Sequence, residues 1–524
     1  MSADPVILGV APIRSLKARR VTAVSDTPAI TPDPLLASAL ATDLDAADFR
    51  SEPLRRLWGE EYDDALARGL RTPILRAIEG DASPLATLGR LLVLGIPQPE
   101  DAVADALPRT GVAGLVALGL ARDDGSVIRP TALVRPQSFV DADGIGEWWI
   151  ASDLDEVALG SALPADHVLG VGGASRTLAE LVIPQPVSRA LDLGTGCGIQ
   201  ALLVSRHAGT VVATDISERA LAFGRLNALL NGVSNIEFRL GSMFEPVADE
   251  AFDLVVSNPP FVITPRVDSV PEYEYRDGGL IGDALVEQFL RTVPDHLTPG
   301  GVAQLLGNWE SRDGSAGLDR LRSWIPSELD AWVIEREELS PLAYAELWIR
   351  DGGTTPRDAG FTPLLDAWLD DFAAREVTAI GFGYVLIRRG SPDVEALRRF
   401  EHVAQPISQT GRALQAGLVA HDALAHGIPQ TLFVAGDVTE ARHLLPGNDD
   451  PSVIELRQGG GFGRTIAVDP ALAAFVGACD GDLTVAQIAA ALADLFEVPL
   501  PDLWADLEPR IRQLILDGFL TSAP

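Results

Sequence analysis

The stretch Arg189-Ala190-Leu191-Asp192-Leu193-Gly194-Thr195-Gly196-Cys197-Gly198 decides the fold of this chain. It is a short apolar strand that runs into a glycine-rich turn, and a helix-like stretch, residues 199–207, follows it. Glycines let a backbone approach a ligand closely, and the N–H groups at the start of a helix point towards that ligand. The third glycine comes one residue too early for a dinucleotide-binding fingerprint. The pattern therefore predicts a ligand-binding turn of another kind.

A second strand-like run, residues 210–214, follows the helix and ends on Asp215. An acidic residue at the end of the second strand, about twenty residues after the glycines, is where such sheets grip the two hydroxyl groups of a ribose. Taken alone, Asp215 could equally be a turn residue that ends a strand. Its place after the glycine turn and the helix favours the ribose-binding interpretation.

Strand-like and helix-like runs alternate along the middle of the chain. Helical stretches such as 218–231 and 283–293 separate the strands, and an insertion with its own helix, about 364–375, precedes the last strand. This alternation predicts a parallel sheet with helices on both faces, and ligands bind such sheets at the carboxyl ends of the strands. The strand-like runs are 188–193, 210–214, 235–240, 252–257, 301–306, 329–336 and 378–388.

The fourth of these runs leads into Asn258-Pro259-Pro260-Phe261, a tetrapeptide suited to the methylation of a planar nitrogen. The lone pair of an amide or exocyclic amine is delocalised, and two acceptors on the same NH2 favour the pyramidal form that can attack. An Asn oxygen is a neutral acceptor, and prolines keep the local carbonyls free and fixed in direction. A phenylalanine supplies a flat face for stacking. The alternative is a strand that ends in a Pro-Pro turn.

In combination these motifs resemble the class I S-adenosylmethionine-dependent methyltransferases, and within them the amino-methylating group with the motif N-P-P-[YF]. The resemblance covers about residues 146–390 and implies an enzyme with a Rossmann-like α/β core of seven strands, the last one antiparallel. Asn258 and the Pro259 carbonyl would hold the target NH2, with Pro260 beside them and Phe261 stacking. The cofactor-binding residues that it implies are Thr177, Asp192, Gly194, Thr195, Gly196, Gly198, Asp215, Ile216, Ser242, Met243 and Asn258.

Two further segments are similar to the glutamine N5-methyltransferases of release factors. The segment 168–180 carries Thr177, which the resemblance implies to be a cofactor contact, and Arg276-Asp277-Gly278-Gly279 matches the substrate loop. The sequence departs from the family pattern at Ser242, because many members have an acidic residue there that contacts the adenine amino group. The resemblance favours a glutamine or asparagine amide of a protein or peptide as the methyl acceptor. The alternatives are adenine N6 or guanine N2 of RNA or DNA, or a non-catalytic cofactor-binding scaffold.

Composition narrows the class of protein and the kind of partner. The net charge is −33 over 524 residues, which disfavours a nucleic-acid partner because affinity for phosphates depends on positive charge. No apolar run is long enough for a membrane span, and no signal-peptide pattern is present, so we expect a cytoplasmic protein with no membrane partner. Two cysteines and seven scattered histidines predict no metal site. The sequence indicates no oligomeric state.

The chain is expected to divide into four parts. Residues 1–34 form a flexible tail, 35–145 a helical, winged-helix-like domain, 146–390 the methyltransferase core, and 391–524 an α+β accessory domain that is also winged-helix-like. Within the core, Trp148-Trp149 is expected to be buried at the domain junction. Tyr273 and Tyr275, in the loop after the tetrapeptide, are candidate substrate contacts. The last region is similar to small modules that hold peptides beside modifying enzymes.

Overall fold

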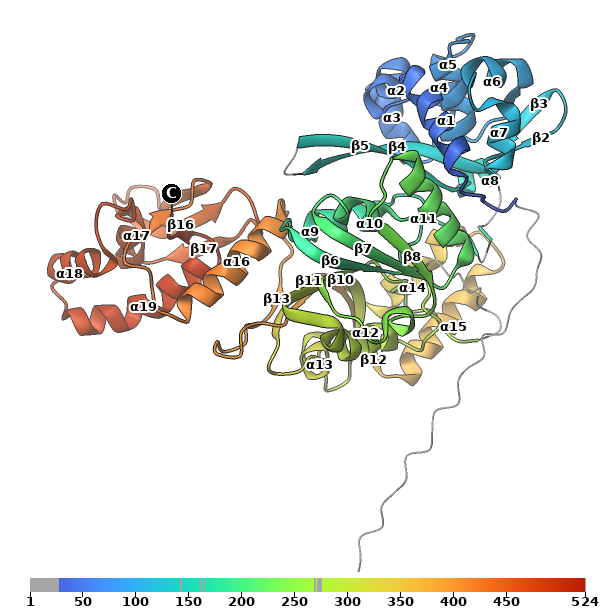
Figure 1. Cartoon of the computed structure of the whole chain (residues 1–524). Coiled ribbons are helices and arrows are strands. Elements are labelled where there is room, and N and C mark those ends of the chain that lie inside the picture. Colours follow the sequence, from blue (N-terminus) through green and yellow to red (C-terminus); the bar gives the residue numbers. More distant parts are fainter. Residues whose placement is uncertain are drawn as a thin grey trace, which may run out of the picture.

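The computed structural model describes residues 28–141, 144–160, 163–164, 166–267, 270 and 276–523. An α/β body lies at the centre, with a helical N-terminal region on one side and a C-terminal region on another (Figure 1). Most of the expected tail, and both Tyr273 and Tyr275, lie outside the described residues. Helix α1 (Pro34–Ala46) begins at the last residue of that tail. Within the described ranges, no helix has both the length and the apolar character that a membrane crossing requires.

The central sheet has the strand order β13-β11-β12-β10-β9-β6-β7-β8. Neighbouring strands from β8 to β10 are parallel, whereas β12 is antiparallel to both β10 and β11. Each predicted run is one of these strands, and the predicted Rossmann-like α/β fold with its antiparallel last strand is confirmed. The strands are β6 (Val187–Leu193), β7 (Ala208–Asp215), β8 (Ile236–Leu240), β9 (Phe252–Ser257), β10 (Leu297–Arg312), β11 (Asp330–Leu339), β12 (Val377–Arg388) and β13 (Arg398–His402).

The sheet contains eight strands, one more than the seven that the sequence predicted. The additional strand, β13, lies beyond the expected core boundary at residue 390 and pairs in parallel with β11. It is a half-buried edge strand, and it is mostly charged, with ion pairs such as Glu401 to Arg464 that connect it to the C-terminal region. A charged edge strand lacks the apolar run by which the other strands were recognised, so the prediction missed it.

Helices cover both faces of the sheet. One face packs against α9 and α10, and the other packs against α12 and α13. The residues of β6 and β9 that are buried between these layers are mostly apolar, as expected for strands covered on both faces. The helices are α9 (Gly173–Leu181), α10 (Ile199–Val204), α11 (Glu218–Leu230), α12 (Ala284–Thr292) and α13 (Gly317–Trp324).

The insertion before the last strand forms two helices, α14 (Pro341–Asp351) and α15 (Phe361–Ala374). Only the second was predicted. They follow the carboxyl end of β11, which runs in the same direction as β10 because both are antiparallel to β12. The two helices therefore lie at the sheet edge where the other parallel strands also end.

The N-terminal region has the connectivity of a winged helix. From α5 to β3 the elements are a helix, a strand, two helices and two strands, and the small sheet has the order β1-β3-β2. This element order supports the winged-helix-like assignment of the region, which stays a prediction. The elements are α2 (Ser51–Trp58), α3 (Glu60–Ala67), α4 (Thr72–Ala77), α5 (Pro84–Leu88), a π-helical turn η1 (Gly89–Val93), β1 (Gln98–Pro99), α6 (Glu100–Ala106), α7 (Gly111–Ala117), β2 (Ala121–Asp123) and β3 (Val127–Pro130).

A long hairpin, β4 (Ala132–Asp141) and β5 (Gly144–Asp153), joins this region to the sheet through side chains of α11. Asn227 accepts a hydrogen bond from the N–H of Ala151 (2.7 Å) and donates to its carbonyl (2.9 Å), as a neighbouring strand would. Asn231 does the same with Trp149, at 2.9 Å for each bond. Asn227 also donates to the carbonyl of Cys197 (2.8 Å), so the junction reaches the glycine turn.

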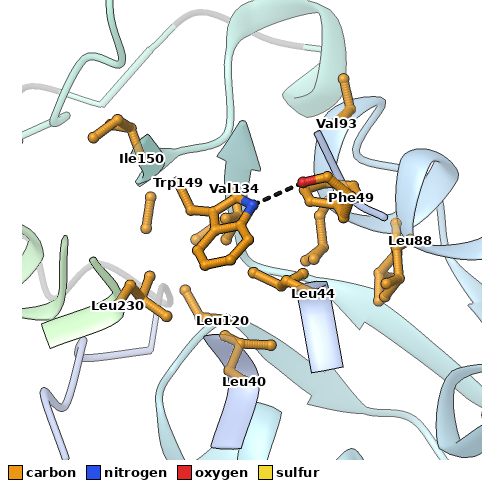
Figure 2. Packing of buried hydrophobic residues seen from close by; sticks show 14 of the residues in the cluster. Leu40, Leu44, Phe49, Leu88, Val93, Leu120, Val134, Trp149, Ile150 and Leu230 are labelled. Atoms are coloured by element: carbon orange, nitrogen blue, oxygen red, sulfur yellow. Dashed lines mark hydrogen bonds between the residues drawn. The ribbon is translucent and has the colours of Figure 1, made fainter. Parts of the chain in front are cut away.

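The two tryptophans of the hairpin are buried at this junction, as predicted. Figure 2 shows Trp149 packed among Leu40 and Leu44 of α1, Phe49, and Leu230 of α11, which belong to one hydrophobic cluster. The indole N–H of Trp149 donates to the carbonyl of Phe49 at 2.7 Å. The N-terminal helices and the central body therefore share one core.

The C-terminal region contains a three-stranded antiparallel sheet followed by three helices. The glycine-rich segment 459–463 links β16 and β17. Helix α18 begins with a capping box in which Thr484 and Gln487 satisfy each other's backbone N–H groups. The elements are α16 (Thr410–Leu424), β14 (Phe433–Val434), β15 (Val438–Leu444), β16 (Pro451–Gln458), β17 (Thr465–Val468), α17 (Pro470–Gly477), α18 (Val485–Leu495), α19 (Leu500–Leu516) and β18 (Leu520–Thr521).

The shared core predicts a graded loss of stability when Trp149 is shortened. Trp149→Ala should lower the free energy of unfolding by about 3–5 kcal/mol, because it opens a cavity and leaves the Phe49 carbonyl unpaired. Trp149→Phe keeps most of the apolar surface and should cost about 1–2 kcal/mol. Urea denaturation of the full chain measures both values, and equal losses for the two variants would contradict this account.

Candidate functional site

Three adjacent parallel strands end at the same level, and this places the predicted motifs side by side. The level residues are Leu193 on β6, Thr214 on β7 and Ser257 on β9. The next residue on each strand is Gly194, Asp215 or Asn258. Neighbouring strands are about 4.8 Å apart, so Asp215 and Asn258 flank the glycine turn within about 10 Å of each other. The structure thus brings together motifs that are 64 residues apart in sequence. The hydroxyl of Ser257 on β9 donates a hydrogen bond to the carbonyl of Leu193 on β6 at 2.8 Å.

The glycine turn adopts a backbone that only glycine adopts readily. Gly194, Gly196 and Gly198 have φ of 76°, 56° and 87°. No atom lies within 4 Å of a Cβ built on Gly194 or Gly196, whereas Gly198 packs against the backbone of Gly224. The N–H groups of Gly194 and Thr195 donate to the Thr214 carbonyl at 2.9 Å. The turn is therefore fixed at its base and open on the side where a ligand would lie.

Asp192, the second-last residue of β6, stabilises this turn through hydrogen bonds. It is 1% exposed, and its Oδ2 accepts hydrogen bonds from the Thr195 hydroxyl (2.5 Å) and from the N–H of Ala201 (2.9 Å). Burial raises the pKa of Asp192 to about 7, although these two hydrogen bonds act in the opposite direction. The carboxylate thus carries a charge above neutral pH in a place with little water to solvate it.

Asp215 occupies the end of β7 that the ribose-binding interpretation requires. Its carboxylate accepts from the N–H groups of Gly196 and Ser217, each at 2.9 Å. Desolvation raises its pKa. Ile216 follows with a 60% exposed side chain, which offers an apolar surface next to the acid.

Asn258 presents a free acceptor. Its Oδ1 is buried and has no hydrogen-bond partner among the described residues. Such an atom costs free energy unless a ligand supplies a donor. Pro259 is buried, and the ring of Phe261 lies against Phe382 with the centroids 5.6 Å apart. The tetrapeptide is therefore a rigid platform with one unused acceptor.

The segment after the tetrapeptide forms a closed loop with a short stem. Phe261 forms a β-bridge with Asp277, and the N–H of Val262 donates to the carbonyl of Arg276 at 2.8 Å. Arg266 crosses the loop and forms an ion pair with Asp277, which is nearly buried. The predicted substrate-loop residues Arg276 and Asp277 therefore hold the loop closed at its base.

The remaining predicted residues are Ser242, Met243 and Thr177, and they lie outside the three strand ends. Ser242 and Met243 are in the loop after β8, which starts where the N–H of Gly241 donates to the Asp215 carbonyl at 3.0 Å. Ser242 is exposed, and Met243 has a positive φ of 48°. Thr177 is half-buried on α9, and among the described residues no hydrogen bond joins it to the glycine turn.

Two buried polar residues near the tetrapeptide were not predicted from the sequence. Asn308 of β10 is 2% exposed, and its Nδ2 lies 2.5 Å from the hydroxyl of Tyr344 on α14. The signal for Asn308 was a polar residue within a largely apolar stretch, and Gln304 and Glu310 of the same strand share that signal. Tyr344 has no such signal, because an aromatic residue in a helix is ordinary core material.

The strand order and the three level strand ends define a Rossmann-like α/β fold, and part of the sequence is similar to a known family. Residues 170–312 match the family described as the methyltransferase small domain, and residues 46–131 match a domain of unknown function, DUF7059. The first match spans the glycine turn, Asp215 and the tetrapeptide.

Individual relatives are similar to less than a quarter of this chain. The chain is 37% identical over 128 residues to a ribosomal protein uL3 glutamine methyltransferase of Bradyrhizobium diazoefficiens, covering 22% of this chain and 40% of that protein. It is 36% identical over 138 residues to a release factor glutamine methyltransferase of Geobacter sulfurreducens, covering 23% and 48%. The chain therefore spans less than half the length of either relative. A solved methyltransferase from Pyrococcus furiosus is 18% identical, with a TM-score of 0.26 and coverage of 41% and 81%.

The raised pKa of Asp192 predicts a pH-dependent gain in stability on its replacement. A carboxyl whose pKa is raised in the folded state stabilises that state below its unfolded pKa of about 3.9 and loses this effect as the pH rises through its folded pKa. Between pH 5 and 8 the free energy of unfolding of Asp192→Asn should therefore improve relative to the native protein by about 2–3 kcal/mol. Urea denaturation at both pH values measures the change. The exposed Asp249→Asn is the control, and a difference independent of pH would contradict the burial of a titrating carboxyl.

Proposed function

We propose that the protein is an S-adenosylmethionine-dependent N-methyltransferase that methylates a side-chain amide of a protein, most plainly a glutamine. The observation that carries the proposal is the buried Oδ1 of Asn258 at the carboxyl end of β9, which has no hydrogen-bond partner in the part of the chain that the structure describes. It stands beside a glycine turn and an acid in the positions at which this fold holds a nucleoside. A donor-bearing NH2 group is the natural partner for that atom.

The residues around the glycine turn fit the proposed cofactor. The open side of Gly194 and Gly196 leaves room for its methionine part, and the carboxylate of Asp192 favours a nearby ammonium group. Asp215 would accept hydrogen bonds from the ribose hydroxyls, and Ile216, Ser242 and Met243 would border the adenine. When bound, the cofactor supplies a methyl group on a positively charged sulfur.

The residues of the tetrapeptide would prepare the acceptor nitrogen. Asn258 Oδ1 and the Pro259 carbonyl accept hydrogen bonds from the two N–H groups of one amide. This favours the pyramidal nitrogen, whose lone pair is available. Phe261 stacks against the amide plane and excludes water. No strong base is needed, because the methylated nitrogen becomes acidic and can release a proton to water. The main contributions to rate are orientation and desolvation.

A protein acceptor is supported by two observations. The relatives that match the core are named for glutamine methylation of a release factor and of a ribosomal protein. The net charge of −33 opposes binding to a polyanion. Such acceptors occur in the cytoplasm, where we place the enzyme. We assign recognition of the acceptor protein to the flanking regions 35–145 and 391–524.

Cofactor binding is expected to depend on Asp215. Asp215→Ala should weaken the affinity for S-adenosylmethionine and for its demethylated product by about 10- to 100-fold, the loss expected for hydrogen bonds to a charged group. Asp215→Asn keeps one acceptor oxygen and should weaken the affinity for both molecules less. Isothermal titration measures both, with Asp249→Ala as a surface control. Absence of binding to the native chain would reject the proposed function.

Methyl transfer is expected to depend on Asn258. Asn258→Ala should reduce the rate at least 100-fold, because the amide loses an acceptor needed for attack, while cofactor affinity changes less than threefold. The assay follows labelled methyl groups into cell extract, which is then digested with protease or with nuclease. Loss of the label on protease treatment supports a protein acceptor, and loss on nuclease treatment rejects it. Undiminished transfer by the variant would refute the role of the tetrapeptide.

A further inference from the structure

Helix α14 is tied to both arms of the stem that closes the loop after the tetrapeptide. The stem consists of 261–263 on one arm and Arg276–Asp277 on the other. The tetrapeptide ends at Phe261, the first residue of the first arm, and α14 begins some 80 residues later in the chain. Two separate contacts join the helix to the stem, one to each arm.

The contact with the first arm is made by the phenol of Tyr344. Its oxygen accepts a hydrogen bond from the N–H of Ile263 at 3.0 Å, two residues after Phe261. Tyr344 is 2% exposed, and its ring packs against Trp368 and Phe372 of α15 at centroid distances of 6.1 and 6.0 Å. The hydroxyl is thus held in one place by the two inserted helices.

The contact with the second arm is made by the guanidinium of Arg276. It donates to the carboxylate of Asp351 (2.9 Å) and to the carbonyl of Trp348 (3.3 Å), both on α14. Arg276 is 9% exposed, and Asp351 of the helix supplies an opposite charge to its guanidinium. Separation of the stem from α14 would leave a backbone N–H and an arginine buried without these partners.

Tyr344 also connects the stem to the strand next to Asn258. The register Ser257–Leu305 between β9 and β10 places Asn258 level with Leu306, and Asn308 follows two residues later on the same face of the sheet. Asn308 contacts the Tyr344 hydroxyl through its Nδ2, while its Oδ1 is buried and has no partner among the described residues. A continuous polar contact thus runs from β10 through Tyr344 to the backbone that follows the tetrapeptide.

We infer that α14 sets the geometry of the methyl-acceptor site and that Tyr344 is a positioning residue for the segment Asn258–Ile263. This inference rests on the proposed function for its meaning in catalysis. Tyr344 acts through the backbone of Ile263, which fixes the direction of Phe261 and of the prolines before it. The insertion 341–374 is therefore part of the acceptor site and not only a cover for the sheet.

The test compares the full-length native protein with Tyr344→Phe, which keeps the aromatic packing and removes only the hydroxyl. Tyr384→Phe is the matched control, since this buried tyrosine bonds to Arg336 and not to the stem. Three quantities are measured: hydrogen–deuterium exchange of the peptide containing Ile263, affinity for S-adenosylmethionine, and single-turnover methyl transfer. The acceptors are the purified release factor and ribosomal protein uL3 encoded by the same genome.

For Tyr344→Phe we expect exchange at Ile263 to rise at least tenfold, transfer to slow at least tenfold, and cofactor affinity to stay within twofold. The KM for the acceptor should change less than the maximal rate, because the residue orients the site and does not touch the acceptor. Tyr384→Phe should leave all three unchanged. Asn308→Ala removes the other partner of the hydroxyl, and its effect should be non-additive with that of Tyr344→Phe.

Several outcomes would overturn the inference. Native rates of transfer in Tyr344→Phe and Asn308→Ala would do so, and so would unchanged exchange at Ile263. A parallel loss of cofactor affinity would show a general structural role instead. If the native protein binds no cofactor, the proposed function fails, and the exchange data still decide whether Tyr344 holds the stem.

Discussion

The register of three parallel strands is the constraint on which the rest of the structure depends. Because β9, β6 and β7 end level with one another, the residues that follow them share one edge of the sheet. Gly194, Asp215 and Asn258 need no long side chain to reach a common ligand. Their places are fixed by backbone hydrogen bonds deep in the core, which is the stiffest part of a protein of this class. The surrounding helices and loops can vary while this edge keeps its geometry.

Much of the fold and of the site was predictable because both depend on local sequence. Buried parallel strands are continuous apolar runs, and turns with positive φ require glycine, so β6 and its turn are legible in the sequence. The convergence of Asp215 and Asn258 on the glycine turn follows from the rule that ligands bind at the carboxyl ends of strands. Burial of Trp148 and Trp149 followed from their size and apolar character.

The rest depends on contacts between segments that carry no local signal. Strand β13 is stabilised by ion pairs across the sheet edge, and a charged pentapeptide gives no indication of its partner. Tyr344 is distinguished from other core aromatics by the two donors to its hydroxyl, Asn308 and the N–H of Ile263, which lie 36 and 81 residues away. In the same way Asn227 appears as one polar residue on an ordinary helix, although it completes the edge of β5 and also contacts the glycine turn. Each of these roles is defined by a partner that sequence spacing does not reveal.

The hairpin β4–β5 shows that the boundaries of the regions matched to known families differ from the boundaries of the units that fold. The matched regions 46–131 and 170–312 leave out residues 132–169, and the hairpin lies in that interval. Its polar backbone edge is completed by side chains from one matched region. Trp149 packs against α1, most of which precedes the other matched region, and against Phe49 within that region. A gene fragment cut at either family boundary would encode a polypeptide with an exposed strand edge and half a core. A chimaera in which the N-terminal helical region is replaced must therefore include the hairpin and the surface of α11 that faces it.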